Sequence, residues 1–228
     1  MCRVGKRGST VRVYELLGYS TNTRFPTDGG EVMACYECQQ HGVWFDRPYD
    51  PIDFIEGYRN SPIWIIGLNP AGEAGSNDGR TIDQLINWLQ DPANRHQYFG
   101  VFQSVSEQLF NELGHDNGVA HTDLVKCYSR RWNLNQEVVN NCAHYLVQQL
   151  AAHQPRVLVC NGADTSRLVQ SQIQPVDWIH PFTSYRAVLG GQNIWVVLSG
   201  FLGQTDNWAK RRLGREITEI AQLAGVWQ

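Results

Sequence analysis

The stretch IWIIGLNPA, residues 63–71, decides the fold of this chain. Residues 63–68 form a short apolar run that Asn69-Pro70 stops, as is typical of a strand buried on both faces. Further strands are predicted over residues 119–125, 156–160 (RVLVC) and 194–198 (IWVVL). Helical patterns lie between or beside them, at residues 82–89, 102–113, 137–153, 163–170 and 207–224. Strands alternating with helices predict an α/β fold with a parallel sheet covered on both faces.

The length of 228 residues fits a single domain spanning residues 1–228. Residues 1–60 lack periodicity and are expected to form an N-terminal extension, and residues 72–100 an insertion that begins as a loop. Hydrophobic residues make up 42% of the chain and charged residues 18%, which excludes a disordered or collagen-like protein. The sequence has no apolar run of membrane-spanning length and no signal core, so we expect a cytoplasmic protein that binds no membrane.

The net charge is -3 at pH 7, which disfavours nucleic-acid binding by bulk charge alone. A local cluster of basic residues on one face of the protein remains compatible with this net charge.

Six cysteines in a cytoplasmic chain favour metal ligands or buried thiols over disulfides. Cys35 and Cys38 form a C-x2-C pair, and Cys127 and Cys142 a C-x14-C pair. Four thiolates would hold a [4Fe–4S] cluster or a tetrahedral zinc, although the second spacing is too wide for a zinc knuckle. Cys160 lies in an apolar strand and is expected in the core. Scattered buried thiols are the alternative for all of them.

Several short stretches carry a resemblance to a known family: GLNPA (67–71), TDLVKC (122–127), NCAHYL (141–146), PRVLVCNGA (155–163) and CYEC (35–38). In combination they resemble the uracil-DNA glycosylase superfamily, and most of all its iron–sulfur branch, whose four cysteines follow the same order. The resemblance implies a three-layer α/β/α fold with a short central parallel sheet. It also implies a [4Fe–4S] cluster at Cys35, Cys38, Cys127 and Cys142, with structural zinc as the alternative.

The resemblance further implies an enzyme that rotates a nucleotide out of single- or double-stranded DNA and hydrolyses its glycosidic bond. The chain is expected to act as a monomer. Asn69 occupies the position of the residue that orients the attacking water, in a loop where Gly67 and Leu68 line the base pocket. An Asx turn that ends the strand is the alternative role for Asn69.

Asp123 departs from the pattern of the uracil enzymes, which have Asn at this position. An ionised carboxylate only accepts hydrogen bonds, so it suits the N4 amino group of cytosine and repels the O4 of uracil. A cytosine-like base is therefore the expected substrate, modified at C5 because excision of ordinary cytosine would destroy the host genome. A capping or surface role for Asp123 is the alternative.

The last motif also differs from the family pattern. The iron–sulfur branch has His-Pro-Ser here, whereas this chain has SGFLGQT, residues 199–205. Ser199 or Gln204 is the expected substitute donor to the departing base. His180-Pro181 precedes the strand and is expected to lie outside this site.

The DNA-contacting residues are inferred from position alone. Tyr98 or Phe99 is expected to stack on the flipped base, with core packing as the alternative. Phe201 and Leu202 lie where relatives wedge into the duplex. Phosphate contacts are expected from Arg130, Arg131, Lys210, Arg211 and Arg212. A solvated helix face is the alternative for residues 210–212.

Three functions follow from these residues. The first is a monofunctional glycosylase that excises a modified cytosine, as in phage DNA that carries hydroxymethyl or glucosyl groups, in a defence role. The second is repair of uracil or another deaminated base. The third is a non-catalytic iron–sulfur protein that binds DNA.

Overall fold

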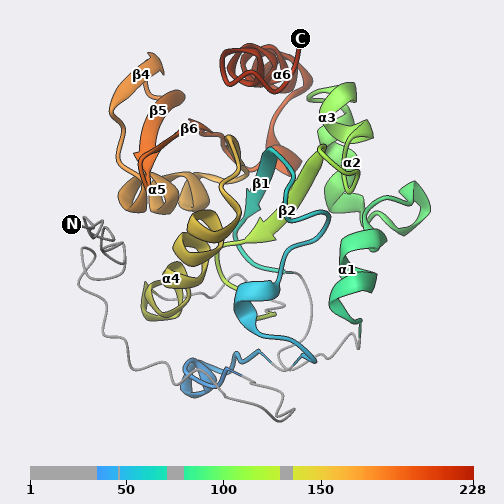
Figure 1. The fold of residues 1–228 in the computed structure, drawn as a ribbon, viewed down its shortest axis with the longest axis vertical. Helices are drawn as coiled ribbons and strands as arrows, with labels where there is room; N and C mark the ends of the chain where they lie inside the picture. Colours follow the sequence, from blue (N-terminus) through green and yellow to red (C-terminus); the bar gives the residue numbers. More distant parts are fainter. Residues whose placement is uncertain (1–34, 46, 71–79, 129–135) are drawn as a thin grey trace, which may run out of the picture. The chain divides into compact units, whose positions relative to one another are not determined.

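The computed structural model describes residues 35–45, 47–70, 80–128 and 136–228, which lie in one compact unit. Its centre is a six-stranded sheet with the order β2-β1-β3-β6-β5-β4 (Figure 1). The strands are β1 Ile63–Gly67, β2 Val119–Asp123, β3 Val157–Cys160, β4 Asp177–His180, β5 Ser184–Leu189 and β6 Gln192–Val197. The expectation of a single domain also covers residues 1–34, which lie outside the described residues.

The four predicted strands form a parallel block. β1 pairs in parallel with β2 on one side and with β3 on the other, and β3 pairs in parallel with β6. The parallel core of the predicted fold is therefore confirmed. The sequence did not predict β4 and β5, which extend the sheet beyond β6 as an antiparallel pair.

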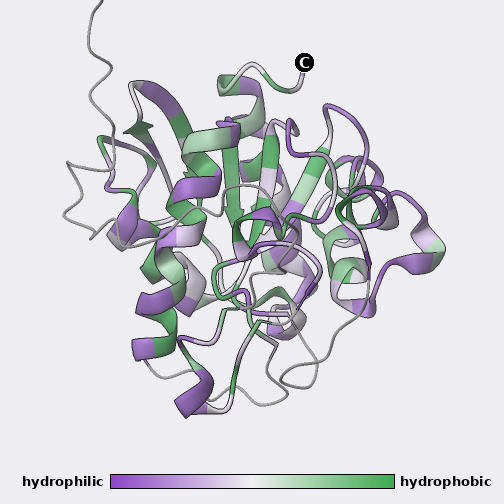
Figure 2. Cartoon of the chain, turned by 60° about the horizontal axis from the view of Figure 1, so that its bottom comes forward, coloured by the Kyte–Doolittle hydropathy of each residue, from purple (hydrophilic) through white to green (hydrophobic). Residues whose placement is uncertain are grey.

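Helices cover both faces of the sheet, as predicted. Alternate residues of β1 separate the two cores: Trp64 and Ile66 pack with α4 and α5, whereas Ile63 and Ile65 pack with α2, α3 and α6. The hydrophobic colouring concentrates along the central strands in Figure 2. The helices are α1 Ile82–Trp88, α2 Gln97–Gln103, α3 Glu107–Asn111, α4 Gln136–His153, α5 Ala163–Gln172 and α6 Asn207–Leu223. None in the described part of the chain is long and apolar enough to cross a membrane.

The helix predicted over residues 102–113 is wrong in its extent, because two shorter helices occupy this region. Ser106 separates them: its hydroxyl accepts a hydrogen bond from the Leu109 backbone N–H at 3.2 Å and so begins α3. A serine that satisfies the first free N–H groups favours a new helix start over a continuous helix.

The segment before β1 is hydrogen-bonded to the last residues of β2. Glu56 and His121 exchange backbone hydrogen bonds of 2.8 Å in both directions. The Thr122 hydroxyl donates to the Phe54 carbonyl at 2.7 Å, and the Gln149 amide donates to the same carbonyl at 3.1 Å. Residues of the predicted N-terminal extension therefore form part of the wall of the strand-end region.

Candidate active site

The carboxyl ends of the parallel strands lie at the same edge of the sheet, and α/β proteins bind their ligands at this edge. Gly67 and Asp123 are register partners, and the Leu124 N–H donates to the Gly67 carbonyl at 3.0 Å. The Asn161 N–H, just after β3, donates to the Ile66 carbonyl at 2.9 Å. These contacts bring together the end of β1, the end of β2 and the loop that follows β3.

Asp123 ends β2 with its side chain directed over Gly67. The residue is only 3% exposed. A Cβ built on Gly67 would lie 2.2 Å from Asp123 Oδ1, so glycine is required here for the carboxyl to occupy this place. Burial raises the pKa of Asp123 to about 6, against the opposing attraction of His121. Because it is buried, Asp123 is not the surface residue that the alternative describes.

His121 is a residue of this site that the motifs did not indicate. It precedes Asp123 by two residues, so both side chains lie on one face of β2. Its Nδ1 lies 2.7 Å from Glu56 Oε2, and its Nε2 lies 3.8 Å from Asp123 Oδ1. Burial lowers the pKa of His121, but the Asp123 and Glu56 carboxylates outweigh it and the net shift is upward. An imidazole thus stands between two carboxyl groups.

The aromatic pair Tyr98 and Phe99 packs on His121, with ring centroids 5.4 and 5.1 Å from the imidazole. Phe99 is 3% exposed and belongs to the core, which corrects the expectation that it stacks on a base. Tyr98 is half-buried, and its hydroxyl lies 3.1 Å from the position of a Cβ on Gly67. Tyr98 is therefore the member of the pair that reaches the site.

Asn161, within the PRVLVCNGA stretch, links this site to the last loop. Its Nδ2 donates to the Tyr98 hydroxyl at 2.9 Å, and its Oδ1 accepts from the Leu202 N–H at 3.0 Å. The amide therefore holds an aromatic of α2 and the loop after β6 in fixed relation.

Asn69 lies where predicted, two residues after β1, and is partly exposed at the strand-end edge. Its Nδ2 donates to the Pro70 carbonyl at 3.1 Å. A local bond of this kind is compatible with the alternative role of Asn69 in a turn that ends the strand. It also restricts the orientation of the side-chain amide.

Ser199 and Gln204, the residues of the last motif expected to donate a hydrogen bond to the base, differ in whether their side chains are free to do so. The Ser199 hydroxyl donates to the Cys160 carbonyl at 2.6 Å and also lies 3.0 Å from the Gly200 carbonyl. A hydroxyl carries one proton, and that of Ser199 is already donated to a backbone carbonyl. The expectation that Ser199 donates a hydrogen bond to the base is therefore corrected. Gln204 is exposed in the short helix η5, Leu202–Gln204. His180 lies 3.1 Å from Glu219 of α6, away from the Asp123 cluster as expected.

Two exposed aromatic residues, Phe201 and Phe182, lie in loops beside β6 and β5. Phe201 is 47% exposed, whereas Leu202 is 1% exposed and packs in the core. Leu202 is therefore not the wedge that was expected, because its side chain anchors the loop. The Leu198 N–H donates to the Thr183 carbonyl at 2.7 Å, which places the β4–β5 turn beside this loop. Phe182 in that turn is 83% exposed and was missed, because its strands were not predicted.

The predicted basic residues divide into two groups. Lys210 is half-buried, and Arg211 and Arg212 are exposed on the first turns of α6. Arg130 and Arg131 lie outside the described residues, as does the start of the 72–100 insertion.

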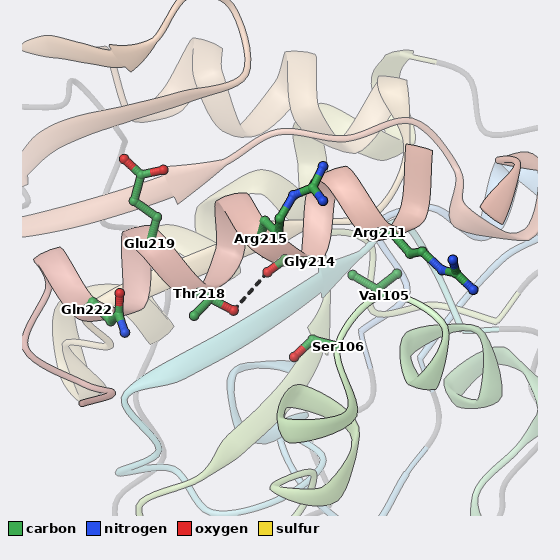
Figure 3. A pocket seen from close by; sticks show the side chains of 8 residues that line it. All are labelled: Val105, Ser106, Arg211, Gly214, Arg215, Thr218, Glu219 and Gln222. Carbon is green, nitrogen blue, oxygen red and sulfur yellow. Dashed lines mark hydrogen bonds between the residues drawn. The ribbon is translucent and has the colours of Figure 1, made fainter. Parts of the chain in front are cut away.

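Arg211 also borders an open cavity of about 440 Å³ between α6 and the α2–α3 turn (Figure 3). The two backbones approach closely here, since a Cβ on Gly214 would lie 1.8 Å from the Val105 carbonyl oxygen. Neither Asn69 nor Asp123 lines this cavity, so it is separate from the strand-end cluster.

Lys126 is fully buried behind the site. Its ammonium group donates to Thr122 Oγ1 at 2.8 Å, to Gln149 Oε1 at 2.7 Å and to the Asp123 carbonyl. All three donors are therefore used within the protein, and the amine is held as a structural link between β2 and α4.

The four predicted cysteine ligands are neighbours. Cys38 shares a side-chain hydrogen bond with Cys142, and Cys142 shares another with Cys127. Cys35 is close enough to Cys38 for their charges to interact, and burial raises the pKa of Cys35. Across residues 35–45, 47–70, 80–128 and 136–228, however, no three His, Cys, Asp or Glu side chains are arranged to hold a metal ion. The thiols form a chain of neighbours without enclosing a common centre.

Comparison with known families identifies the class of protein to which this fold and site belong. Residues 54–213 match the family model described as the uracil DNA glycosylase superfamily, and this match spans more than half of the chain. The chain therefore belongs to the uracil-DNA glycosylase superfamily, whose members are DNA-binding glycosylases. The match begins after Cys35 and Cys38, so it does not test the first cysteine pair. No curated protein matches the chain.

Proposed function

We propose that this chain is a monofunctional DNA glycosylase that excises a modified cytosine. The observation that carries the proposal is the buried Asp123 carboxyl at the end of β2, held over Gly67 where no side chain intervenes. An ionised carboxylate accepts from the N4 amino group of cytosine, whereas it repels the O4 of uracil.

The proposed reaction is hydrolysis of the bond between the sugar C1′ and the base N1. The electron pair of that bond leaves with the base, the oxygen of one water molecule bonds to C1′, and the proton released from the water ends on the base. Asn69 orients the water, and polar groups around the base stabilise its developing negative charge. The commitment of all three Lys126 donors supports this monofunctional route over one through a lysine–sugar adduct.

Excision of uracil or another deaminated base is the second candidate, and the raised pKa of Asp123 favours it under acidic conditions. A protonated carboxyl carries one O–H donor beside a carbonyl acceptor, the same pair that an asparagine amide offers. In this form Asp123 would donate to O4 and accept from N3–H of uracil. The two candidates therefore differ in the pH at which they operate.

DNA is the proposed partner, contacted along the edge that carries the site. Phe201 and Phe182 are exposed aromatics of adjacent loops and are proposed to enter or stack on the DNA. Lys210, Arg211 and Arg212 follow on α6 and are proposed to contact phosphates. Action as a monomer on modified phage DNA in a defence role is the corresponding biological proposal.

A base-release assay tests the function. Matched DNAs carrying uracil, cytosine, hydroxymethylcytosine and glucosylated hydroxymethylcytosine are incubated with the protein, and abasic sites are measured at pH 5 to 8. We expect abasic sites in a modified-cytosine DNA at neutral pH and none in ordinary cytosine DNA. Release from uracil alone across the range would establish the repair function instead. DNA binding without release from any substrate would favour the non-catalytic function.

We also propose that Cys35, Cys38, Cys127 and Cys142 hold a [4Fe–4S] cluster, as in the iron–sulfur branch. The type of donor supports the proposal, because thiolates are the ligands of such clusters. Cys38, Cys142 and Cys127 are linked by side-chain hydrogen bonds, and Cys35 lies near Cys38. The Asn141 amide donates to Cys38 Sγ at 3.4 Å, the kind of bond that supports a metal-bound sulfur. The bound cluster would join the segment before β1 to α4 and the end of β2. A reducing, cytoplasmic setting suits these thiols.

Metal analysis of matched variants tests this proposal. The parent, purified without oxygen, is expected to contain about four iron and four sulfide per chain. Cys142→Ala should lose this iron, whereas Cys160→Ala, a buried strand cysteine outside the set, should retain it. One zinc per chain in the parent, or equal iron loss in both variants, would be evidence against the cluster.

A further inference from the structure

His121 has no part in the reaction proposed above, although it is buried within the site. It is 3% exposed, and within the described residues its Nε2 has no hydrogen-bond partner. An unpaired nitrogen in the interior costs free energy unless a ligand or water completes it. This nitrogen is aimed at the space above Gly67, 2.9 Å from the position of an absent Cβ.

We propose that His121 is a second base-reading residue, which acts with Asp123 to select cytosine over uracil; this inference rests on the proposed function. Nε2–H of His121 and the Asp123 carboxylate together present a donor beside an acceptor, with Nε2 and Oδ1 3.8 Å apart. Cytosine presents the complementary pair, since its N4 amino group donates and its N3 accepts. Uracil presents the reverse pair, because its O4 accepts and its N3–H donates.

Glu56 is the positioning residue of this pair. Its Oε2 lies 2.7 Å from Nδ1 of His121, so Nδ1–H donates to the carboxylate and the ring is fixed with Nε2 facing the site. The backbone bridge between the same two residues adds to this restraint. A negative charge on each side of the ring favours the imidazolium form, which has a proton on Nε2 to donate.

The same contact would assist the departure of the base. As the bond from C1′ to N1 breaks, negative charge spreads over the ring of the leaving cytosine, including N3. A cationic donor fixed at N3 stabilises this charge more than it stabilises the neutral substrate. His121, which lies on β2, would thereby stabilise the departing base in place of the His that is missing from the last motif.

The ionisable groups that face His121 come from three segments. Glu56 precedes β1, Asp123 and Lys126 follow along β2 and its loop, and Tyr98 lies on α2. The carboxylates support the cationic ring and Lys126 opposes it. Removal of the Glu56 charge should therefore make His121 lose its proton at lower pH.

The test compares base release from modified-cytosine and uracil DNAs by the parent, His121→Asn, His121→Gln, Glu56→Gln and the control His180→Asn. A glutamine places an N–H group near the position of Nε2, whereas an asparagine does not reach it. We expect His121→Asn to lower modified-cytosine release about 5- to 150-fold, the effect of one reading contact, with partial recovery in His121→Gln. The control should match the parent, because His180 pairs with Glu219 instead.

The pH profile separates reading from a structural role. Release by the parent should decline as pH rises through the pKa of His121, and Glu56→Gln should move this decline to lower pH. If both His121 variants and Glu56→Gln keep the parent's base preference and profile while the parent excises modified cytosine, this inference fails and the proposed function stands. If the parent releases no cytosine derivative at any pH, both fail together.

Discussion

Asp123→Asn is expected to reverse the base preference of the protein. The carbonyl of the introduced amide would turn toward the Nε2–H of His121, which lies 3.8 Å from Oδ1 in the parent, and the amino group would then face the base. An amino donor opposes the N4 amino group of cytosine and matches the O4 of uracil. Each such contact discriminates by about 1–3 kcal/mol. Because one contact is lost and another gained, the ratio of kcat/KM for the two substrates should change by about 2–6 kcal/mol, which corresponds to roughly tens to tens of thousands of fold.

The measurement is kcat/KM for release of modified cytosine and of uracil by parent and variant. Asp116→Asn is the matched control, because Asp116 is exposed and bonded to Asn60. Reading by a carboxylate requires ionisation, so modified-cytosine release by the parent should fall as pH drops through about 6. Asp123→Asn should lack this acidic decline. An unchanged preference in the variant would remove Asp123 from base recognition.

The central strands β1 and β3 could be predicted because they are buried on both faces and their sequences are continuous apolar runs. The β6 strand was recognisable from its apolar residues 194–197, whereas β2, with the sequence VAHTD, gave a weaker signal. The edge pair could not be predicted in this way. β4 has the sequence DWIH with every residue at least partly exposed, and β5 mixes buried residues with partly exposed and exposed ones. His180 ends β4, and Pro181 begins the turn to β5. Edge strands lack the continuous apolar signal of central strands.

Asp123 and Asn69 were accessible to sequence reasoning because they lie in the motifs that carry the family resemblance, near the ends of two predicted strands. His121 was not, because its partner Glu56 is 65 residues earlier, in a stretch without periodicity. The available signal was its spacing of two residues from Asp123, which places both on one face of a strand. Phe201 and Leu202 are adjacent in sequence but differ sharply in exposure. The Leu202 backbone is bonded to Asn161, 41 residues earlier, a contact that the sequence did not reveal.

Asn69→Ala is expected to lower base release about 10²- to 10³-fold while DNA affinity stays within a few-fold of the parent. The Asn69 amide is oriented by its bond to the Pro70 carbonyl and is partly exposed at the strand-end edge, where the proposed reaction brings water to the sugar. Alanine removes the polar group that orients this water but leaves Asp123, His121 and the aromatic residues in place. The loss should therefore appear in kcat and in single-turnover rates.

The control is Asn60→Ala, which removes an exposed asparagine that bonds to Asp116. Thermal unfolding of both variants separates lost chemistry from lost structure. Single-turnover release and DNA binding are then measured on the modified-cytosine duplex. If Asn69→Ala equals the parent in both, the side chain serves only the turn before Pro70. A fall in DNA binding as large as the fall in rate would instead assign Asn69 to substrate binding, because an interaction made equally in the bound and transition states changes both alike.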